Sequence, residues 1–548
     1  MKDSRIIRSL SLLLVLFLAA CSPRRGTVEL VFVQTADIHG EIYADNPMDG
    51  SERKGSLLKV ASYIKGVRKE NRNVIYLDAG DNLQGSVEIY HNVVTNLDNP
   101  ELASTVLSAM GCDASVPGNH DIAVGPLPYD RFVKGASFPV LAGNVGYESY
   151  GDYLAPYTVI EKHGVRIAVI GLITKATELS VPSDIYGELG FADMVESARY
   201  WMDVVREKEN PDMVVGLFHS GLKGGRFAEA GIEEDAVLSV AENVPGFDII
   251  FYGHDHTANF DSARNSEGGT VLLVNPGAHC EKVGVVKAAL QFEKGQIIDR
   301  TYSASLVDVT DQKPDAELVK KLAENRAELD SYLDSSIGTL ADDMNLDGMP
   351  ESGASEINYI HGILARHFAA QITLCTPPNE GESFRAGDFT VRDAFRLYPY
   401  ENNMVSLMMS GNEIRNILEY SAQAAIDMEN GTPGYLSWDL YSASGIVYEV
   451  DCKAKPGQRV HISSMMDGTA FNPDAMYRVT MNSFMYGGGD STLPKASGLS
   501  RKQLAARLNL TSKADIRYFI LTDFAVRKEA GLSVEVPKNT NFKYVGLR

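Results

Sequence analysis

The chain has 548 residues, of which 44% are hydrophobic and 22% are charged. At roughly 150 residues per domain, this length allows two large domains or three to four small ones, and the composition excludes a disordered or multi-span membrane chain. Lys and Arg number 51 against 72 Asp and Glu, which gives a formal net charge of -21. Because a protein that binds the phosphate backbone needs a basic surface, we expect no polymeric nucleic acid as a partner.

The first 21 residues have the pattern of a targeting segment. Three basic residues precede an apolar stretch of 11 residues at 10–20, which is too short to span ~30 Å of hydrocarbon but has the length of a signal-peptide core. It ends in Leu-Ala-Ala-Cys, which resembles a bacterial lipobox, so we expect residues 1–20 to be a signal peptide and Cys21 to be lipidated. An ordinary secretory signal is the alternative. We therefore expect a lipid-anchored protein of the cell envelope, periplasmic or surface-exposed, with the outer membrane favoured.

Short β-branched runs alternate with helical patterns from residue 28 to about residue 305. This alternation predicts an α/β domain with largely buried strands. The runs lie at 28–33, 74–77, 166–173, 213–218, 247–251 and 270–274.

The pattern becomes helical and strongly charged over residues 311–335. Leucines recur there at spacings of 4, 7 and 4, which predicts a helix that connects two domains. A second mixed α/β region follows, and Ser410 and Glu413 fit a capping box that predicts the start of a helix. We predict domains at 21–310 and 351–548, joined by a linker helix and loop at 311–350.

Five segments place metal-competent side chains directly after an apolar run. Because sites in open α/β sheets form beyond the carboxyl ends of the strands, we expect these segments to converge. Two divalent cations ~3.5–4 Å apart need a shared carboxylate and accept mixed oxygen and nitrogen ligands. The pattern therefore predicts a two-metal centre that could receive an anionic ester. In chain order the segments are Asp37-Ile38-His39, Asp81-Asn82, Asn119-His120-Asp121, His219 and His254-Asp255-His256.

With these motifs the sequence resembles the calcineurin-like metallophosphoesterases, and more closely the 5'-nucleotidase family, over essentially the whole chain after the targeting segment. The resemblance implies an α/β protein in which a four-layer αββα metallophosphatase sandwich is joined by a helix to a C-terminal α/β nucleotide-binding domain. It implies two divalent metal ions and a role for His120 in stabilising the transition state or assisting the leaving group. Mixed Asp, Asn and His ligands suit Mn, Zn, Fe or Co, and the sequence does not identify which of them is bound. The implied ligands are Asp37, His39 and His256 for the first metal, Asn119, His219 and His254 for the second, and Asp81 for both.

The chain departs from the family at one position of the histidine motif. The family usually has Gly-Asn-His-Glu-Phe-Asp, in which the last Asp orients the histidine, whereas Ala123 stands at that position here. The branch that acts on 2',3'-cyclic nucleotides typically has Asn there, so the carboxylate is not obligatory. Asp121 is one candidate replacement, although adjacent residues rarely face each other. Loss of the orienting partner would slow the reaction without removing the metals.

Segments of the C-terminal half resemble the 2',3'-cyclic-nucleotide 2'-phosphodiesterase/3'-nucleotidase branch most closely. A nucleobase needs flat aromatic faces, and the resemblance implies an aromatic clamp, with core packing as the rival interpretation for each residue. The arginine that grips phosphate or ribose in 5'-nucleotidases has no clear match. Arg385 is a nearby candidate, with solvated surface as its alternative. The clamp candidates are Trp438, Phe484, Tyr486 and, as a further possibility, Tyr435.

The remaining histidines have no partner at ligand spacing. We expect His361 and His367, on an apparent helix, to be packing or surface residues. No role is assigned to the four others, His91, His163, His279 and His461.

The resemblance implies a dimetal phosphoesterase that hydrolyses nucleotides outside the cytoplasm. It would open a 2',3'-cyclic phosphate and then remove the 3'-phosphate, with metal-bound hydroxide attacking phosphorus and His120 helping the ester oxygen to depart. Two alternatives stay open: a 5'-nucleotidase or nucleotide-sugar hydrolase, and a nucleotide-binding lipoprotein with little catalysis, suggested by Ala123 and the absent arginine. The expected partners are a nucleotide substrate and a membrane reached through lipidated Cys21, and no protein partner is predicted.

Overall fold

The N-terminal half of the molecule contains two β-sheets. The computed structural model describes residues 25–147, 151–227, 231–347, 354–378, 382–432, 439–487, 492–537 and 541–547. The first sheet has the order β13 (Gln296–Asp308), β12 (Lys282–Glu293), β1 (Gly26–Thr35), β2 (Val74–Asp78) and β3 (Ala114–Ser115). The second has the order β10 (Asn259–Arg264), β11 (Thr270–Asn275), β9 (Ile249–Tyr252), β8 (Met213–His219), β6 (Val165–Ile173) and β5 (Tyr157–Lys162).

The central strands of both sheets are parallel, so their carboxyl ends lie at one edge of each sheet. β1, β2 and β3 pair in parallel in the first sheet, and β11, β9, β8 and β6 do so in the second. All six predicted runs fall on these strands. The sequence analysis missed the long antiparallel pair of β12 and β13, which pairs with β1 and extends the first sheet.

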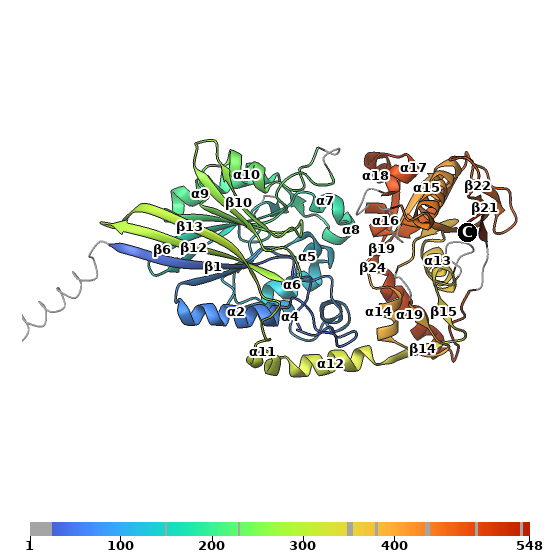
Figure 1. The fold of residues 1–548 in the computed structure, drawn as a ribbon, viewed down its shortest axis with the longest axis horizontal. Coiled ribbons are helices and arrows are strands. Elements are labelled where there is room, and N and C mark those ends of the chain that lie inside the picture. The colour runs from blue at the N-terminus through green and yellow to red at the C-terminus, as the bar shows by residue number, and fades with distance from the viewer. Residues whose placement is uncertain are drawn as a thin grey trace, which may run out of the picture.

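The two sheets pack face to face between outer layers of helices, which confirms the predicted αββα order (Figure 1). Alternation along β1 shows this directly: Leu30 and Phe32 belong to the cluster between the sheets, whereas Val31 and Val33 belong to the cluster under the helices. The first sheet is covered by α2 (Leu57–Glu70), α4 (Leu102–Ala109) and α6 (Pro126–Gly135). The second is covered by α9 (Met194–Glu209) and α10 (Val237–Asn243).

A pair of helices connects the two halves of the chain, where the sequence predicts one. They are α11 (Ala316–Lys321) and α12 (Ala323–Leu333), which meet at Leu322 and run beneath the molecule in Figure 1. The four recurring leucines are buried in the cluster that also contains the outer helices of the first sheet. The same cluster contains Val391 and Phe395 of α14 (Val391–Leu397), so the apolar stripe of the linker packs against residues of both halves.

The C-terminal half is a second α/β unit. Its main sheet has the order β20 (Ser442–Ser444), β16 (Ile372–Cys375), β23 (Met476–Asn482), β19 (Asn403–Ser410) and β24 (Leu508–Asp515). Helix α15 (Gly411–Glu429) begins at the predicted point, because the Ser410 side chain accepts from the backbone of Glu413 and the Glu413 side chain accepts from that of Ser410. Among the described residues, no helix combines the length and the apolar character that a membrane span requires.

His361, on α13 (Ser355–Phe368), is a buried core residue, as the sequence suggests. Its ring nitrogens lie 2.7 Å from Thr373 Oγ1 and 3.0 Å from Ser442 Oγ, so it ties the helix to β16 and β20. Burial lowers the pKa of His361 to about 3.

The stability of the C-terminal half is therefore expected to fall as the pH drops from about 6.5 towards 3. Below about pH 6.5 His361 binds a proton in the unfolded chain but stays neutral in the folded protein. One such proton changes the free energy of unfolding by up to about 1.4 kcal/mol per pH unit. His361→Gln should be less stable at pH 7.5 but should show a shallower slope between pH 6.5 and 4. Urea unfolding of both proteins across this range tests the point, with the exposed His461→Gln as control, and equal slopes would contradict it.

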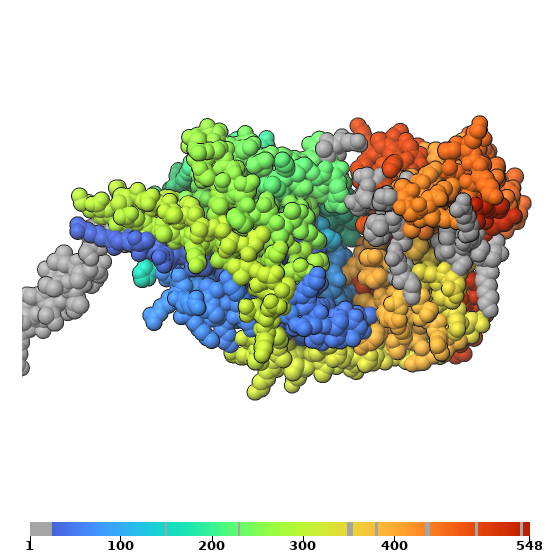
Figure 2. Space-filling view, viewed as in Figure 1, coloured from blue at the N-terminus to red at the C-terminus, as the bar shows by residue number. Residues whose placement is uncertain are grey.

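The two halves touch through a buried arginine. Arg517, on α19 (Ile516–Glu529), lies with its guanidinium 4.4 Å from the ring centroids of both Tyr90 and Phe395. It pairs with Glu401 at 3.2 Å and with Asp515 at 3.3 Å, and the Tyr90 hydroxyl donates to Asp515 at 3.1 Å. Since Tyr90 belongs to the N-terminal half, this cluster docks the halves against each other along the boundary visible in Figure 2.

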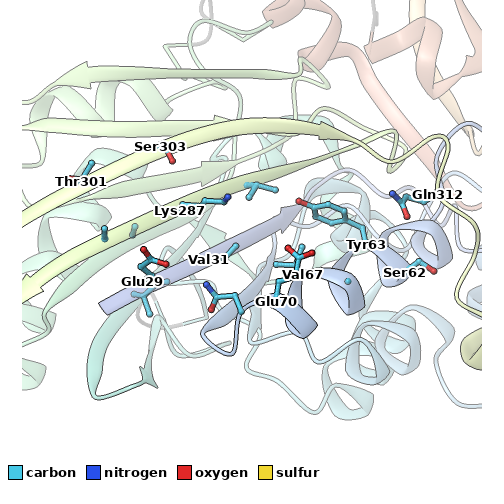
Figure 3. Close-up of a pocket in the computed structure, with 16 residues that line it drawn as sticks. Glu29, Val31, Ser62, Tyr63, Val67, Glu70, Lys287, Thr301, Ser303 and Gln312 are labelled. Atoms are coloured by element: carbon cyan, nitrogen blue, oxygen red, sulfur yellow. The ribbon is translucent and has the colours of Figure 1, made fainter. Parts of the chain in front are cut away.

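A cavity of about 630 Å³ lies on the outer face of the first sheet, between β1, β12, β13 and α2 (Figure 3). Its polar lining includes Glu29, Tyr63, Glu70 and Lys287. None of the candidate metal ligands lines it, so it is separate from the site described below.

Candidate active site

The seven candidate ligands all follow or end strands, and both sheets contribute to them. Asp37 and His39 come after β1, Asp81 after β2, and Asn119 opens the short helix α5 (Asn119–Ala123) after β3. From the second sheet, His219 is the last residue of β8, and His254 and His256 follow β9. The site therefore forms where the carboxyl ends of the two sheets meet.

The first cluster consists of Asp37, His39 and His256, whose ligand atoms all lie within 4.8 Å of one another. His39 Nε2 and His256 Nε2 are 2.9 Å apart, and His256 Nε2 is 3.6 Å from Asp37 Oδ1. His39 Nδ1 donates to the Gln84 carbonyl oxygen at 2.9 Å, so its Nε2 carries the lone pair in the neutral ring. This is the tautomer that a metal ligand needs, with the orienting carbonyl that such ligands usually have.

The second cluster consists of Asp81, His219 and His254, again within 4.8 Å of one another. His219 Nε2 lies 3.2 Å from Asp81 Oδ2 and 3.2 Å from Asn119 Oδ1, so Asn119 joins the group. His219 Nδ1 donates to the Ala79 carbonyl oxygen at 2.7 Å, which again leaves Nε2 for a cation.

The charge of Asp81 acts on histidines of both clusters. Burial lowers the pKa of His39 to about 3 and that of His256 to about 4, and the charge of Asp81 opposes both shifts. Against the effect of burial, Asp81 and Asp37 raise the pKa of His219 to about 10, which shows how strongly this site favours positive charge. The donor set of carboxylates, an amide and imidazoles fits two divalent cations, and a carboxylate shared between them is what such a pair needs.

Backbone strain marks the same residues. Asp37, His39, Asp81, His254 and His256 all have positive φ values, between 49° and 81°, which non-glycine residues adopt at a cost. Close packing adds to the constraint, because a Cβ at Gly118 would stand 1.9 Å from Asp81 Oδ1. The chain therefore stores strain to hold these side chains in one place.

Asp121 holds the Asp81 loop and does not contact the His120 ring, contrary to the role considered for it from the sequence. Its two carboxylate oxygens accept from four backbone amides, those of Gly118, Asp81, Asn82 and Leu83, at 2.7–2.8 Å. The His120 ring instead contacts Gln84, whose side-chain oxygen lies against His120 Nδ1.

Asp121→Asn is accordingly expected to weaken metal binding by about 10–100-fold, the usual effect of losing support around a ligand. The amide nitrogen of Asn replaces one of the carboxylate oxygens, and it cannot accept the hydrogen bonds from the two backbone amides that this oxygen binds. Metal content after dialysis against graded chelator measures the effect. The control is Asp130→Asn, a half-exposed carboxylate on α6, and unchanged metal retention in Asp121→Asn would contradict this role.

His279 and Glu234 also lie at the site, and the sequence analysis missed them. The His279 ring is 5.5 Å from that of His39 and 5.9 Å from that of His256, and its Nδ1 is 3.2 Å from Glu41 Oε1. Glu234 Oε1 is 3.2 Å from His254 Nε2. The Asn-Pro-Gly turn that follows β11 could have indicated that His279 lies at the end of a strand, like the other ligands. No comparable local pattern in the sequence indicates Glu234.

The structure tests the substrate residues less fully. Phe484, on α16 (Ser483–Gly487), is 46% exposed, while Tyr486 packs against the core of the C-terminal half. Arg385 directly follows β17 (Ser383–Phe384) and is exposed. The arginine that contacts α16, on which Phe484 and Tyr486 lie, is Arg501, which donates to the Gly487 carbonyl. Cys21, Tyr435 and Trp438 lie outside the described residues, so their roles stay predictions.

Comparison with known proteins agrees with this arrangement. Residues 30–258 match the calcineurin-like phosphoesterase family, and residues 324–496 match the 5'-nucleotidase C-terminal domain.

Curated relatives match both halves together. A 2',3'-cyclic-nucleotide 2'-phosphodiesterase/3'-nucleotidase of Salmonella typhimurium is 26% identical over 90% of this chain and 88% of its own length. A protein of the same name from Yersinia enterocolitica is 25% identical over 92% and 89%.

Solved structures share the fold. A 5'-nucleotidase precursor from Thermus thermophilus matches with a TM-score of 0.57 at 22% identity, covering 95% of this chain and all of that one. The NAD nucleotidase of Haemophilus influenzae matches with a TM-score of 0.62 at 17% identity, covering 95% and 99%. The chain therefore contains a calcineurin-like phosphoesterase domain, of a family that uses a dinuclear metal centre, followed by a 5'-nucleotidase C-terminal domain, and this combination identifies it as a hydrolase acting on phosphate esters.

Proposed function

We propose that this enzyme hydrolyses 2',3'-cyclic nucleotides and then the resulting 3'-nucleotides. The convergence of two metal-competent clusters beside His120 carries the proposal, because it supplies what phosphoryl transfer requires. The nucleotide branch is supported by the two relatives described above, which share both halves of the chain.

The proposed assignment of the ligands is the one that the sequence suggests, with Asp81 shared between the two cations, and the two clusters support it. When bound, the metals would supply positive charge at the phosphoryl oxygens and a water of lowered pKa. The mixed oxygen and nitrogen donors suit Mn, Zn, Fe or Co.

His120 is proposed to act on the departing oxygen. Its backbone amide donates to Asp81 Oδ1 at 2.8 Å, and its ring lies 5.1 Å from that of His39, so it stands at the margin of both clusters. With Nδ1 donating to Gln84, the doubly protonated ring would carry a second proton on Nε2, and this proton would stabilise or protonate the oxygen as its bond to phosphorus breaks. In the cyclic substrate that oxygen is the ribose 2'-oxygen, and in the second reaction it is the 3'-oxygen.

The aromatic residues of the C-terminal half are proposed to bind the base. Phe484 offers an exposed ring, and stacking on a base is worth about 1–3 kcal/mol. Trp438, Tyr435 and Tyr486 remain candidates for the opposite face, and Arg385 remains the candidate for the phosphate or ribose.

Side-by-side assays of 2',3'-cyclic AMP, 3'-AMP and 5'-AMP test the proposal, with metal content measured on the same preparation. We expect about two metal ions per chain and turnover of the first two substrates. Absence of metal, or turnover confined to 5'-AMP, would overturn it.

A 5'-nucleotidase or nucleotide-sugar hydrolase is the second candidate. A 5'-nucleotidase of Vibrio cholerae is 23% identical over 89% of this chain and 92% of its own length, which is why 5'-AMP belongs in the assay. A uridine diphosphate sugar added as a fourth substrate separates the two versions of this candidate. A binding protein with little catalysis has less support, because His120 has a partner in Gln84 despite Ala123.

Attachment to the cell envelope through lipidated Cys21 is also proposed, on the lipobox pattern alone. A Cys21→Ser variant is expected to leave the membrane fraction, whereas the parent protein should incorporate labelled fatty acid. A parent protein found free of lipid would refute the anchor without affecting the catalytic proposal.

A further inference from the structure

The loop that follows β2 lies between the metal clusters and the C-terminal half. It contains Asp81, then Gln84 and Gly85, and leads into the short helix α3 (Val87–Tyr90). His120 lacks the family carboxylate, because Ala123 stands at that position. Gln84 is the residue that contacts the His120 ring in the structure.

Gln84 binds two histidines of the site through two different oxygens. Its backbone carbonyl accepts from His39 Nδ1 at 2.9 Å, and its side-chain carbonyl faces His120 Nδ1. Because an amide oxygen can only accept, this contact makes Nδ1 of His120 a hydrogen-bond donor and leaves Nε2 to face the substrate, where the doubly protonated ring has a proton to donate. An orienting carboxylate does the same, but it also adds a negative charge.

The backbone around Gln84 is held from both sides by carboxylates. On one side, Asp121 accepts from the amides of Asn82 and Leu83, at 2.7 Å and 2.8 Å. On the other side, the Gly85 amide donates at 3.2 Å to Glu401 Oε1, which belongs to the C-terminal half. Gly85 has a φ of 133°, and a Cβ there would stand 2.8 Å from His39 Cβ, so the loop has little room to shift.

Glu401 is itself fixed. Its side chain is 11% exposed and pairs with the buried Arg517 at 3.2 Å. Docking of the C-terminal half is therefore linked to the position of Gln84 through one backbone hydrogen bond.

We propose that Gln84 is the positioning residue of His120, and that the C-terminal half keeps Gln84 in place by binding the Gly85 amide through Glu401. This proposal rests on the proposed function, in which His120 assists departure of the ester oxygen. It assigns to an amide in the Asp81 loop the orienting task that the family motif gives to a carboxylate.

Leaving-group dependence separates positioning from a merely structural role. A nucleotide releases an alkoxide that needs help from His120, whereas p-nitrophenyl phosphate releases a phenolate that is stable without a proton. Gln84→Ala removes the side-chain oxygen but keeps the backbone carbonyl that holds His39, so the metal content should stay at the parent value. We expect kcat on 3'-AMP to fall about 10–100-fold with KM changed less than about threefold, and kcat on p-nitrophenyl phosphate to fall less than about threefold.

Two further variants complete the test of Gln84. Gln84→Glu keeps an acceptor for His120 Nδ1 and should recover most of the activity that Gln84→Ala loses. His120→Ala gives the reference for comparison. Its loss of kcat should depend on the leaving group in the same way and should be at least as large as that of Gln84→Ala. Equal losses of Gln84→Ala on both substrates, loss of metal, or full activity on 3'-AMP would each overturn the proposal.

The contribution of Glu401 is tested with a matched pair. Glu401→Gln and Glu401→Ala both remove the charge that faces Arg517, but only Glu401→Gln keeps an acceptor for the Gly85 amide. Glu401→Ala should therefore lose more kcat on 3'-AMP than Glu401→Gln does, with a smaller difference on p-nitrophenyl phosphate. Identical behaviour of the two variants would remove Glu401 from the proposal.

The outcome can be told apart from failure of the proposed function. If the parent enzyme hydrolyses only 5'-AMP, the cyclic-nucleotide proposal fails. The role of Gln84 can still be tested, because 5'-AMP also releases an alkoxide and can be used in place of 3'-AMP in each comparison. If the parent hydrolyses 3'-AMP while Gln84→Ala is fully active, only the positioning role fails.

Discussion

Replacing Asp81 with Asn is expected to abolish most activity and to reduce the bound metal to one ion per chain or fewer. Asp81 Oδ2 lies 3.2 Å from His219 Nε2, and its charge also reaches His39 and His256. A neutral amide cannot offset the repulsion between two cations ~3.5–4 Å apart. We expect kcat/KM to fall by at least about 10²–10³-fold, the range seen when a group that stabilises transition-state charge is removed.

Elemental analysis and steady-state kinetics on one preparation of Asp81→Asn measure both effects. The exposed Asp261→Asn on β10 is the matched control, because it makes the same chemical change away from the site. Two metal ions per chain and parent-like turnover in Asp81→Asn would contradict the bridging role.

Replacing Arg517 with Ala is expected to lower the free energy of unfolding by about 3–5 kcal/mol, the usual cost of removing one partner from a buried ion pair. The side chain is 3% exposed, and its loss leaves Glu401 and Asp515 without their cation. It also removes the guanidinium that lies against the rings of Tyr90 and Phe395. The effect should be largest in the C-terminal half.

Urea unfolding of Arg517→Ala followed by circular dichroism measures this loss. Arg264→Ala on β10 serves as control, since Arg264 is exposed and, within the described part of the chain, its guanidinium donates to the nearby Gly268 carbonyl alone. Arg517→Met distinguishes charge from volume, because it fills the space but still leaves both carboxylates unpaired. A loss below about 1 kcal/mol in Arg517→Ala would show that the docking cluster contributes little.

Much of the N-terminal architecture could be predicted from the sequence because its parallel strands are buried on both faces. Such strands consist of continuous β-branched runs, so their positions can be predicted from the sequence without knowing which strands they pair with. The β12 and β13 pair was missed, since β13 is largely half-buried or exposed and lacks such a run. The linker was predicted as one helix because periodicity shows a buried face but does not show the break at Leu322.

The candidate ligands could be named from the sequence, but their supporting contacts could not. Asp-x-His and His-x-His at strand ends are local patterns, and the resemblance sorted them into two groups. Gln84 and His279 contact residues that are distant in the chain, His120 and His39 respectively. No pattern of residue spacing in the sequence predicts such contacts. Asp121 was considered as a partner of His120 only because the two are adjacent in the chain, and its carboxylate instead accepts from backbone amides of the Asp81 loop and of Gly118.

If Cys21 is lipidated as proposed, the direction of β1 sets how far the metal ligands lie from the point of attachment. The strand begins at Gly26, five residues after Cys21, and ends two residues before Asp37. Ten residues at a rise of about 3.3 Å separate these ends by roughly 33 Å, and the start of β1 lies at the end of the molecule far from the C-terminal half (Figure 1). A tether of at most about 18 Å would keep the start of β1 near the bilayer, and the metal ligands would lie at the other end of the strand.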